Sequence, residues 1–172
     1  MAKIAFVLDE MFEDSEFQVP YERVKEAGHE PVVVGLEAGK KLEGKKGDVT
    51  TTTEVAAGDV DPDEIAALVI PGGYSPDKIR TDDAVVGLTK SIHGAGKPVA
   101  AICHAGWVLA EAGLVRGKTV TSWPSIKTDL VNAGANWVDQ EVVEDGNLIT
   151  SRKPDDLEAF SKALLAQVEQ QT

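Results

Sequence analysis

The chain has 172 residues, 42% of them hydrophobic, and we expect one globular domain over residues 1–172. Seventeen basic residues against 29 acidic ones give a formal net charge of -12, which argues against broad binding to nucleic acid or to an anionic membrane. No apolar run approaches the roughly 18 residues of a membrane-spanning helix. A single cysteine cannot form an internal disulfide, so a cytoplasmic location is expected.

Hydrophobic patterning along the chain predicts alternating strands and helices. Strands are predicted at residues 3–8, 31–34, 66–70, 98–102, 119–122, 138–143 and 148–150. Helices are predicted between the loop at 11–16 and Gly28, in parts of 75–95, and at 105–112, 123–133 and 154–168, with a capped turn at 59–65 and a small β excursion at 36–53. This alternation is typical of an α/β sandwich with a mostly parallel sheet.

Local signals refine several element boundaries. The first run, at residues 3–8, ends in acids and has no small-residue cleavage site, so it indicates a strand and not a signal peptide. Asp14 or Ser15 can cap the first helix, while Pro20 either lies in its first turn or kinks it. The Asp-Gly-Asn sequence at 145–147 is a strong signal for a β-hairpin.

A strand-to-helix elbow lies at the centre of the chain. Residues 98–102 are typical of a buried strand, and residues 105–112 are rich in helix formers. Cys103 and His104 therefore lie where a nucleophile elbow lifts one side chain above the carboxyl ends of a sheet. Because a helix N-terminus favours the thiolate, we expect the pKa of Cys103 to lie below the free value of about 8.5.

Cys103 is the single cysteine of the chain. A free cysteine is commonly a small buried hydrophobe, and its place at the elbow is what favours a nucleophile. His104 is a candidate base, although its side chain could also point away from the sulfur toward the surface or a subunit interface. The three histidines and the one cysteine show no metal-ligand spacing, so no metal or other cofactor is predicted.

The loop after the first strand carries two candidate partners of the thiol, Glu13 and Glu16. Strand topology brings this loop to the same sheet edge as Cys103. Acids also occur in a solvated first helical turn, where the helix dipole favours them. A carboxyl beside a thiolate shares one proton with it, so a protonated glutamate would donate a hydrogen bond to the sulfur and stabilise it.

A glycine pair follows the predicted strand at 66–70. Gly72 and Gly73 expose backbone N–H groups without a Cβ in the way. We expect the N–H groups of Gly73 and His104 to hold a developing oxyanion beside Cys103, with Gly72 and Glu13 also binding substrate. No Lys-Ser or Lys-Thr follows the glycines, so they are not a phosphate loop.

Several motifs together resemble one known family. They are FEDSE at residues 12–16, PGGYSPD at 71–77, AICH at 101–104 and TSWPSIK at 121–127, with a matching tail at 132–152. In this order the chain is similar to the PfpI family, the intracellular-protease-like branch of the parkinsonism-linked deglycase superfamily. That superfamily is related to class I glutamine amidotransferase domains. The resemblance covers nearly the whole chain.

The resemblance implies a flavodoxin-like three-layer sandwich and a homodimer or larger homo-oligomer. It implies that Cys103 is the nucleophile and that Glu16 is its partner in the first loop. In protease-like members an acid from a neighbouring subunit polarises the histidine that follows the cysteine, here His104. That acid maps to Asp77, where the family pattern usually has glutamate.

The resemblance also implies a stress-response cysteine enzyme that acts on reactive carbonyls. Its substrates would be methylglyoxal or glyoxal, or their adducts with proteins and nucleotides, with no stable nucleic-acid binding and no membrane partner. One alternative is an intracellular peptidase that uses Cys103, His104 and Asp77. Another is a redox sensor or chaperone, in which Cys103 is oxidised to a sulfinate beside Glu16.

Overall fold

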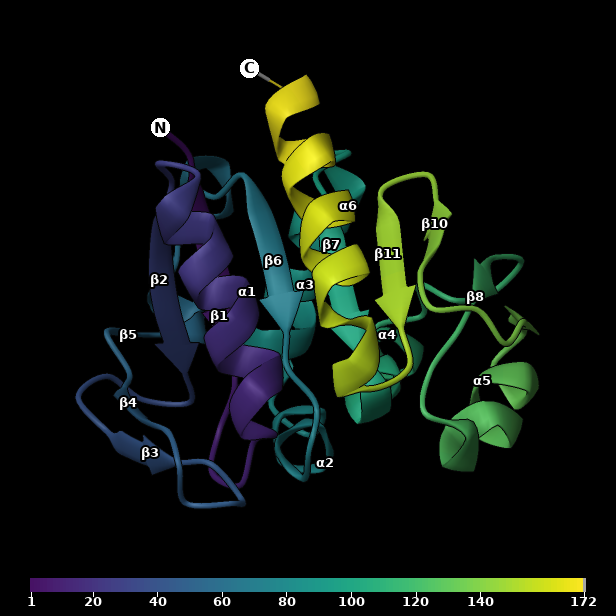
Figure 1. The fold of residues 1–172 in the computed structure, drawn as a ribbon, viewed down its shortest axis with the longest axis horizontal. Helices are drawn as coiled ribbons and strands as arrows, with labels where there is room; N and C mark the ends of the chain where they lie inside the picture. Colours follow the sequence, from purple (N-terminus) through teal and green to yellow (C-terminus); the bar gives the residue numbers. More distant parts are fainter. Residues whose placement is uncertain (172) are drawn as a thin grey trace.

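A computed structural model describes residues 1–171, and a seven-stranded sheet lies at its centre (Figure 1). In chain order its strands are β1 (Lys3–Val7), β2 (Glu30–Gly35), β5 (Val55–Ala56), β6 (Ala67–Ile70), β7 (Val99–Ile102), β10 (Val143–Asp145) and β11 (Leu148–Ser151). The spatial order is β10-β11-β7-β6-β1-β2-β5, and every neighbouring pair is parallel except β10 with β11. The predicted mostly parallel sheet is confirmed.

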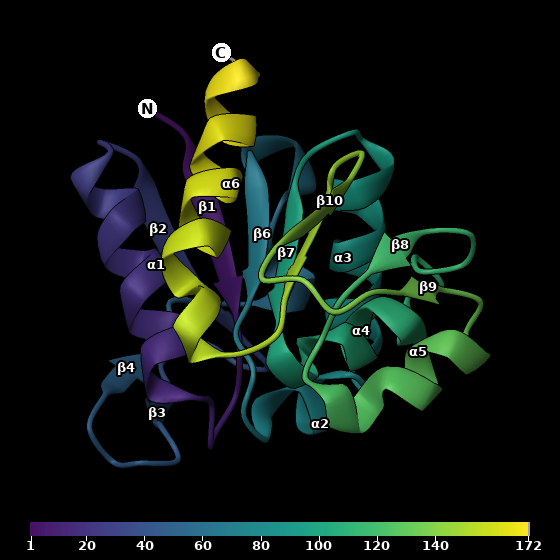
Figure 2. The same ribbon diagram turned by 45° about the vertical axis from the view of Figure 1, so that its right-hand side comes forward.

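Helices cover both faces of this sheet. They are α1 (Asp14–Glu26), α2 (Ser75–Ile79), α3 (Asp83–Gly94), α4 (Gly106–Glu111), α5 (Lys127–Asn132) and α6 (Leu157–Gln170). Figures 1 and 2 show α1 and α6 side by side on one face and α3 and α4 on the other. The result is the expected three-layer α/β sandwich.

Two small sheets lie outside the main one. The antiparallel pair β3 (Lys41–Glu43) and β4 (Thr50–Thr52) forms the predicted β excursion. The parallel pair β8 (Thr119–Val120) and β9 (Asn136–Trp137) lies with α5 at the other side of the molecule (Figure 2). Short 3-10 turns occur at Ala57–Asp59, Pro62–Glu64, Cys103–Ala105, Pro124–Ile126 and Pro154–Asp156.

The core forms two layers because strand residues alternate between the faces of the sheet. In β1, Ile4 and Phe6 pack into the cluster that includes α1 and α6, while Ala5 and Val7 pack into the cluster that includes α3 and α4. All four side chains are fully buried. Burial on both faces explains why the predicted strands are continuous apolar runs instead of alternating ones.

An aromatic cluster fixes the start of α1 against the sheet. The Phe17 ring lies 5.9 Å from Phe6 and 5.4 Å from Phe12, both in edge-on geometry. Tyr21, one turn further along α1, lies 5.1 Å from Phe17. Such pairs add to the hydrophobic burial of the rings. They therefore hold the loop that precedes α1 at the carboxyl end of β1.

Some predicted boundaries are wrong. Neither Asp14 nor Ser15 is the N-cap of α1: Glu13 occupies that position, and Asp14 is the first helical residue. Pro20 lies in the helix interior, beyond the first turn. Residues 138–142 form no strand, because the chain leaves β9 and pairs again only at β10, across the predicted Asp-Gly-Asn hairpin. The two-residue strand β5 has no counterpart among the predicted strands.

Among residues 1–171, no helix has both the length and the apolar character needed to cross a lipid bilayer. The helix α6 is amphipathic instead. Leu164 is fully buried against the sheet, whereas Lys162 on the same helix is exposed.

We expect Leu164→Ala to lower the free energy of unfolding by about 2–5 kcal/mol, because the deletion leaves a cavity between α6 and the sheet. Lys162→Ala, the matched control on the exposed face, should change it by less than about 0.5 kcal/mol. Urea denaturation followed by circular dichroism measures both values. Equal effects of the two substitutions would contradict the assigned inner face of α6.

Candidate active site

Cys103 lies on a sharp elbow between β7 and α4. Its φ is 64°, in the left-handed region that non-glycine residues rarely adopt. The Trp123 N–H donates to the Cys103 carbonyl over 3.3 Å, and a 3-10 turn at Cys103–Ala105 leads into α4. Backbone strain of this kind persists only where the surroundings enforce it, and it is concentrated at functional sites. The predicted elbow is confirmed.

The loop before α1 is tied to the glycine turn after β6. The Glu13 N–H donates to the Gly72 carbonyl over 3.0 Å, and the Tyr74 N–H donates to the Met11 carbonyl over 2.9 Å. Gly73 has a φ of 85°, and a Cβ there would collide with the backbone of the first loop. The two segments that sequence analysis placed at one sheet edge are therefore held together by backbone hydrogen bonds.

Glu16 is fully buried beside the cysteine. Its Oε1 accepts a hydrogen bond from the Gly72 N–H over 2.9 Å, while Oε2 has no hydrogen-bond partner among the described residues. Burial, and then the charge of Glu13, raises the pKa of Glu16 to about 8, although Gly72 N–H, Lys45 and the Cys103 side chain lower it. At neutral pH this carboxyl is protonated and faces the thiol as a donor.

The Cys103 thiol differs from the expectation of a lowered pKa. Burial, and then the Glu16 carboxylate, raises the pKa of Cys103 to about 12, and the N–H groups of His104 and Gly73 oppose this rise. The start of a short helix does not compensate for a buried sulfur beside a carboxyl. The thiol and Glu16 therefore titrate as a coupled pair, and protonation of Glu16 removes the charge that disfavours the thiolate.

His104 points toward the sulfur. Its Nδ1 lies 3.3 Å from Cys103 Sγ, and its Nε2 lies 3.2 Å from Ser125 Oγ. Burial, and then the positive charge of Lys45, lowers the pKa of His104. The ring also packs at 5.2 Å from Trp107. A neutral imidazole in contact with the thiol can take a proton from it or return one. Ser125 was missed as a partner of His104 in the sequence analysis.

Glu13 is buried at the mouth of the site and pairs with two lysines. Lys46 Nζ lies 3.2 Å from its Oε1, and Lys45 Nζ lies 3.6 Å from its Oε2. The carboxylate of Glu13 is one of the causes that raise the pKa of Glu16. Glu13 thus acts on the thiol through its neighbour.

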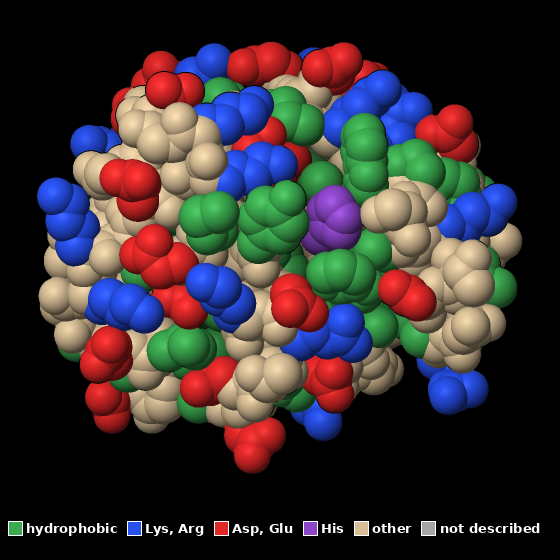
Figure 3. Space-filling model, turned by 90° about the horizontal axis from the view of Figure 1, so that it is seen from below, with side chains coloured by type: hydrophobic (Ala, Val, Ile, Leu, Met, Phe, Trp, Pro, Cys, Tyr) green, Lys and Arg blue, Asp and Glu red, His purple; other side chains and the backbone are tan. Residues whose placement is uncertain are grey.

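These side chains line a cleft of about 230 Å³. Its lining residues are Glu13, Glu16, Lys45, Cys103, His104, Trp123 and Pro154. Figure 3 looks at this end of the molecule, where the parallel strands terminate, and shows a histidine surrounded by hydrophobic side chains with charged ones nearby. Lys45, Trp123 and Pro154 were missed in sequence analysis as cleft residues, because they come from three separate loops. The volume admits a small organic group and not a whole macromolecule.

Asp77 lies apart from the other candidates. It is an exposed residue of α2, and within the described chain no hydrogen bond or ion pair joins it to His104. The family resemblance attributes this acid to a neighbouring subunit. No hydrogen bond or ion pair within the described chain connects Asp77 to the active site, so its role there belongs to the proposed function below.

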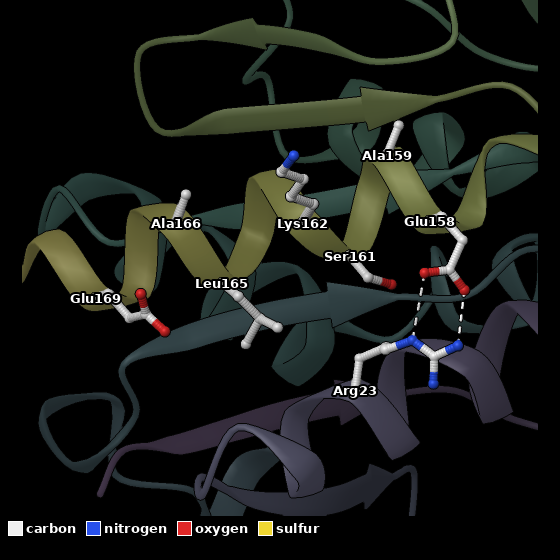
Figure 4. A pocket seen from close by; sticks show the side chains of 8 residues that line it. All are labelled: Arg23, Glu158, Ala159, Ser161, Lys162, Leu165, Ala166 and Glu169. Atoms are coloured by element: carbon white, nitrogen blue, oxygen red, sulfur yellow. Dashed lines mark hydrogen bonds and ion pairs between the residues drawn. The ribbon is translucent and has the colours of Figure 1, made fainter.

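A larger hollow of about 590 Å³ lies between α1 and α6 (Figure 4). Arg23 on α1 faces Glu158 on α6 there, and their closest charged atoms are 2.8 Å apart. The eight described residues that line it include no cysteine or histidine. Within the described part of the chain, no group of three or more His, Cys, Asp or Glu is placed to hold a metal ion.

Fold and site together define an α/β protein with a cysteine nucleophile elbow. The chain belongs to the DJ-1/PfpI family, whose profile matches residues 2–167. The family resemblance found in the sequence is thereby confirmed.

Relatives within the family cover almost the whole chain. Protein/nucleic acid deglycase 2 of Escherichia coli is 44% identical over 164 residues, which are 95% of each protein. YraA of Bacillus subtilis, whose name marks cysteine protease as a supposed activity, is 46% identical over 163 residues, or 95% of this chain and 96% of YraA. The crystal structure of Drosophila melanogaster DJ-1beta has a TM-score of 0.88 at 33% identity, covering 97% of this chain and 90% of that one.

We expect alkylation of Cys103 by iodoacetamide to rise in two steps with pH. The coupled pair loses its first proton near pH 8 and its second toward pH 12. Because the two groups share the remaining proton after the first loss, a fraction of the pairs then carries the charge on sulfur and reacts. Glu16→Gln removes the acid, so the step near pH 8 should vanish. The single remaining step, the ionisation of Cys103, should then occur below pH 12 because no carboxylate opposes it. Exposed Glu37→Gln is the control, and identical profiles for Glu16→Gln and wild type would exclude a coupled pair.

We expect Gly72→Ala to separate Glu16 from the thiol. A Cβ at Gly72 would overlap Glu16 Oε1 and lie 2.8 Å from Cys103 Cβ. Unfolding should become easier by about 1–3 kcal/mol, as overpacking usually causes, and the alkylation step near pH 8 should be lost. Gly87→Ala in α3 has open space and should leave the alkylation profile unchanged. An unaltered profile in Gly72→Ala would contradict the close approach.

Proposed function

We propose that this protein is a cysteine-dependent deglycase that acts on reactive carbonyls, in the form of methylglyoxal or glyoxal or of their protein and nucleotide adducts. The observation that carries the proposal is the convergence of four groups on Cys103 Sγ: the Glu16 carboxyl, His104 Nδ1 and two backbone N–H groups. Relatives at 41–44% identity that are named deglycases support the substrate class.

The first step forms a carbon–sulfur bond. His104 Nδ1 takes the proton of the Cys103 thiol as the sulfur attacks the aldehyde carbon, and the electron pair of the C=O bond moves onto the oxygen. The N–H groups of Gly73 and His104 stabilise this oxyanion, and the proton of Glu16 passes to it to give a hemithioacetal. In an adduct the same carbon carries a hydroxyl group and nitrogen instead of a C=O bond, so the carbon–sulfur bond forms as the carbon–nitrogen bond breaks, and the amine leaves with a proton to give the same hemithioacetal.

The later steps return the enzyme to its starting state. The Glu16 carboxylate, now unprotonated, takes a proton from the carbon that bears sulfur, while the protonated His104 gives its proton to the neighbouring carbonyl oxygen, so that an enediol forms. Glu16 then returns its proton to the neighbouring carbon, and the hydroxyl on the sulfur-bearing carbon loses its proton to His104 and becomes a carbonyl. The product is a thioester of a 2-hydroxy acid. Water then cleaves the thioester to release lactate from methylglyoxal, or glycolate from glyoxal, and the free thiol. One water is added overall and no cofactor takes part in this sequence.

The cleft size supports a small reacting group. A volume of about 230 Å³ accommodates a two- or three-carbon dicarbonyl unit but not the protein or nucleotide that carries it. An adduct would therefore insert only its sugar-derived end. We propose the same chemistry for free aldehydes and for adducts exposed on a macromolecular surface.

We further propose that the protein is a homodimer or larger homo-oligomer in the cytoplasm. Tyr74 and Trp123, 62% and 40% exposed, leave large hydrophobic side chains on the surface. Asp77 does not contact His104 within the chain, so a neighbouring subunit would have to supply it. The lone cysteine suits a reducing compartment.

A second candidate function is peptide hydrolysis. The contact of His104 Nδ1 with Cys103 Sγ at 3.3 Å is the observation that favours it, because peptide cleavage needs a base that later protonates the amine. The name of YraA points the same way. This reaction would also depend on Asp77, which is one methylene shorter than the glutamate usual in the family.

We expect Cys103→Ala to abolish turnover of methylglyoxal and of its adducts, and Asp77→Asn to retain most of it. Lactate production at steady state measures this, with an adduct of methylglyoxal on an arginine derivative and a fluorogenic peptide assayed in parallel. Peptide cleavage that is lost in Asp77→Asn, together with no lactate from the wild type, would overturn the deglycase proposal in favour of the peptidase.

A further inference from the structure

Lys45 is a cation at the active-site cleft that the reaction above does not use. It lies in the turn between β3 and β4 and lines the same cleft as Cys103 and His104. Its Nζ is 3.6 Å from Glu13 Oε2 and 5.6 Å from the centre of the Tyr74 ring. A third of the Lys45 side chain is exposed. The ammonium thus lies where a substrate enters.

The backbone of this turn is held rigidly against α1. The carboxylate of Asp14 accepts the N–H groups of Lys46, Asp48 and Val49, each over 2.9 Å. The Lys45 N–H donates to the Phe12 carbonyl, also over 2.9 Å. The burial of Asp14 raises its pKa, but the backbone donors together outweigh this effect and the pKa is lowered. A charged Asp14 therefore anchors the turn and fixes the position of Lys45.

Lys45 shares its carboxylate partner, Glu13, with a second lysine. Glu13 has a nearer cation in Lys46, at 3.2 Å, so Lys45 at 3.6 Å is not needed to neutralise it. Glu16 is neutral at pH 7 because its pKa is raised to about 8. Glu13, Lys45 and Lys46 together carry one positive charge in excess. The charged Asp14 that anchors the same turn offsets part of it, although its oxygens are taken up by three backbone N–H groups.

The field of Lys45 reaches every reactive group of the cleft. Its positive charge lowers the pKa of Cys103, of Glu16 and of His104. An anion bound to Lys45 would thus lie within electrostatic reach of the sulfur. The hydroxy acid released by the proposed reaction is an anion of this kind.

We propose that Lys45 determines specificity by binding the carboxylate of a small 2-oxo or 2-hydroxy acid in the cleft beside Cys103. The proposal rests on the proposed function for its choice of acid. The ammonium attracts the carboxylate by charge, and its contact with the Tyr74 ring, 5.6 Å away, favours its position at the cleft. The small volume of the cleft restricts the ligand to a few carbons.

Two alkylating agents of equal size test this charge directly. Iodoacetate carries a carboxylate next to the reacting carbon and iodoacetamide carries a neutral amide; in both reactions the sulfur displaces iodide. The ratio of the two rates cancels the fraction of thiolate, which a substitution at Lys45 would also alter. Cys103 is the single cysteine, so mass spectrometry of the intact protein reports one site.

We expect Lys45→Met to lower the iodoacetate-to-iodoacetamide rate ratio about fivefold at low salt, the factor for one charge contact with strong water screening. Lys45→Arg should keep most of the ratio. Lys46→Met is the matched control: it removes a charge from the same turn and from the same Glu13, but outside the cleft, so its ratio should stay near that of the wild type. Added salt should reduce the difference.

Equal effects of Lys45→Met and Lys46→Met would overturn the proposal, because they would indicate a general effect of net charge. An unchanged ratio in Lys45→Met would overturn it as well.

Protection from iodoacetamide identifies the ligand: lactate should protect Cys103 in the wild type and not in Lys45→Met, and neutral 1,2-propanediol should protect neither. Protection of wild type and Lys45→Met alike would contradict the carboxylate contact. If the deglycase assay shows no activity but the alkylation rate ratio changes as expected, the proposed function is rejected and the anion subsite is retained.

Discussion

The hydrogen bond from the Gly72 N–H to Glu16 Oε1 holds a buried carboxyl against the Cys103 sulfur. Its consequences extend through the whole site. The approach is so close that a Cβ at Gly72 would overlap the carboxyl oxygen, so the turn after β6 needs a glycine there. Burial makes Glu16 a proton donor at neutral pH and makes its charged form costly, which couples its proton to that of Cys103. Beside the sulfur, Glu16 can therefore donate a proton when it is protonated and accept one when it is ionised.

The architecture brings these groups together by topology. Parallel strands end at one edge of the sheet, so the segments after β1, β6 and β7 meet although they are far apart in sequence. The aromatic cluster around Phe17 fixes α1. The backbone hydrogen bonds that Asp14 accepts then fix the turn that bears Lys45 against this helix. The strands and helices thus hold together a site whose reactive side chains come from the first turn of α1 and from the 3-10 turn after β7.

Members of this family with almost the same fold carry names for different activities. A relative named as a deglycase is 44% identical to this chain over 164 residues, and one named as a supposed cysteine protease is 46% identical over 163 residues. A fold shared at this level does not select a substrate; the groups that line the cleft do. In this chain those groups are a neutral imidazole, a protonated carboxyl and a lysine, in a space suited to small polar carbonyl compounds.

Much of this protein could be read from the order of its residues. Continuous apolar runs and glycine stops determined most of the strands and helices, because burial and chain reversal depend on local residue type. The elbow at Cys103 and the pairing of two loops with it followed from strand topology. The extent of β10 and the role of Asp14 did not follow, because each depends on partners more than 30 residues away or on a break in pairing. The tertiary structure alone decided the protonation of Cys103 and Glu16 and the arrival of Lys45 at the cleft. Burial and the distances between charges set these properties, and neither is encoded in local pattern.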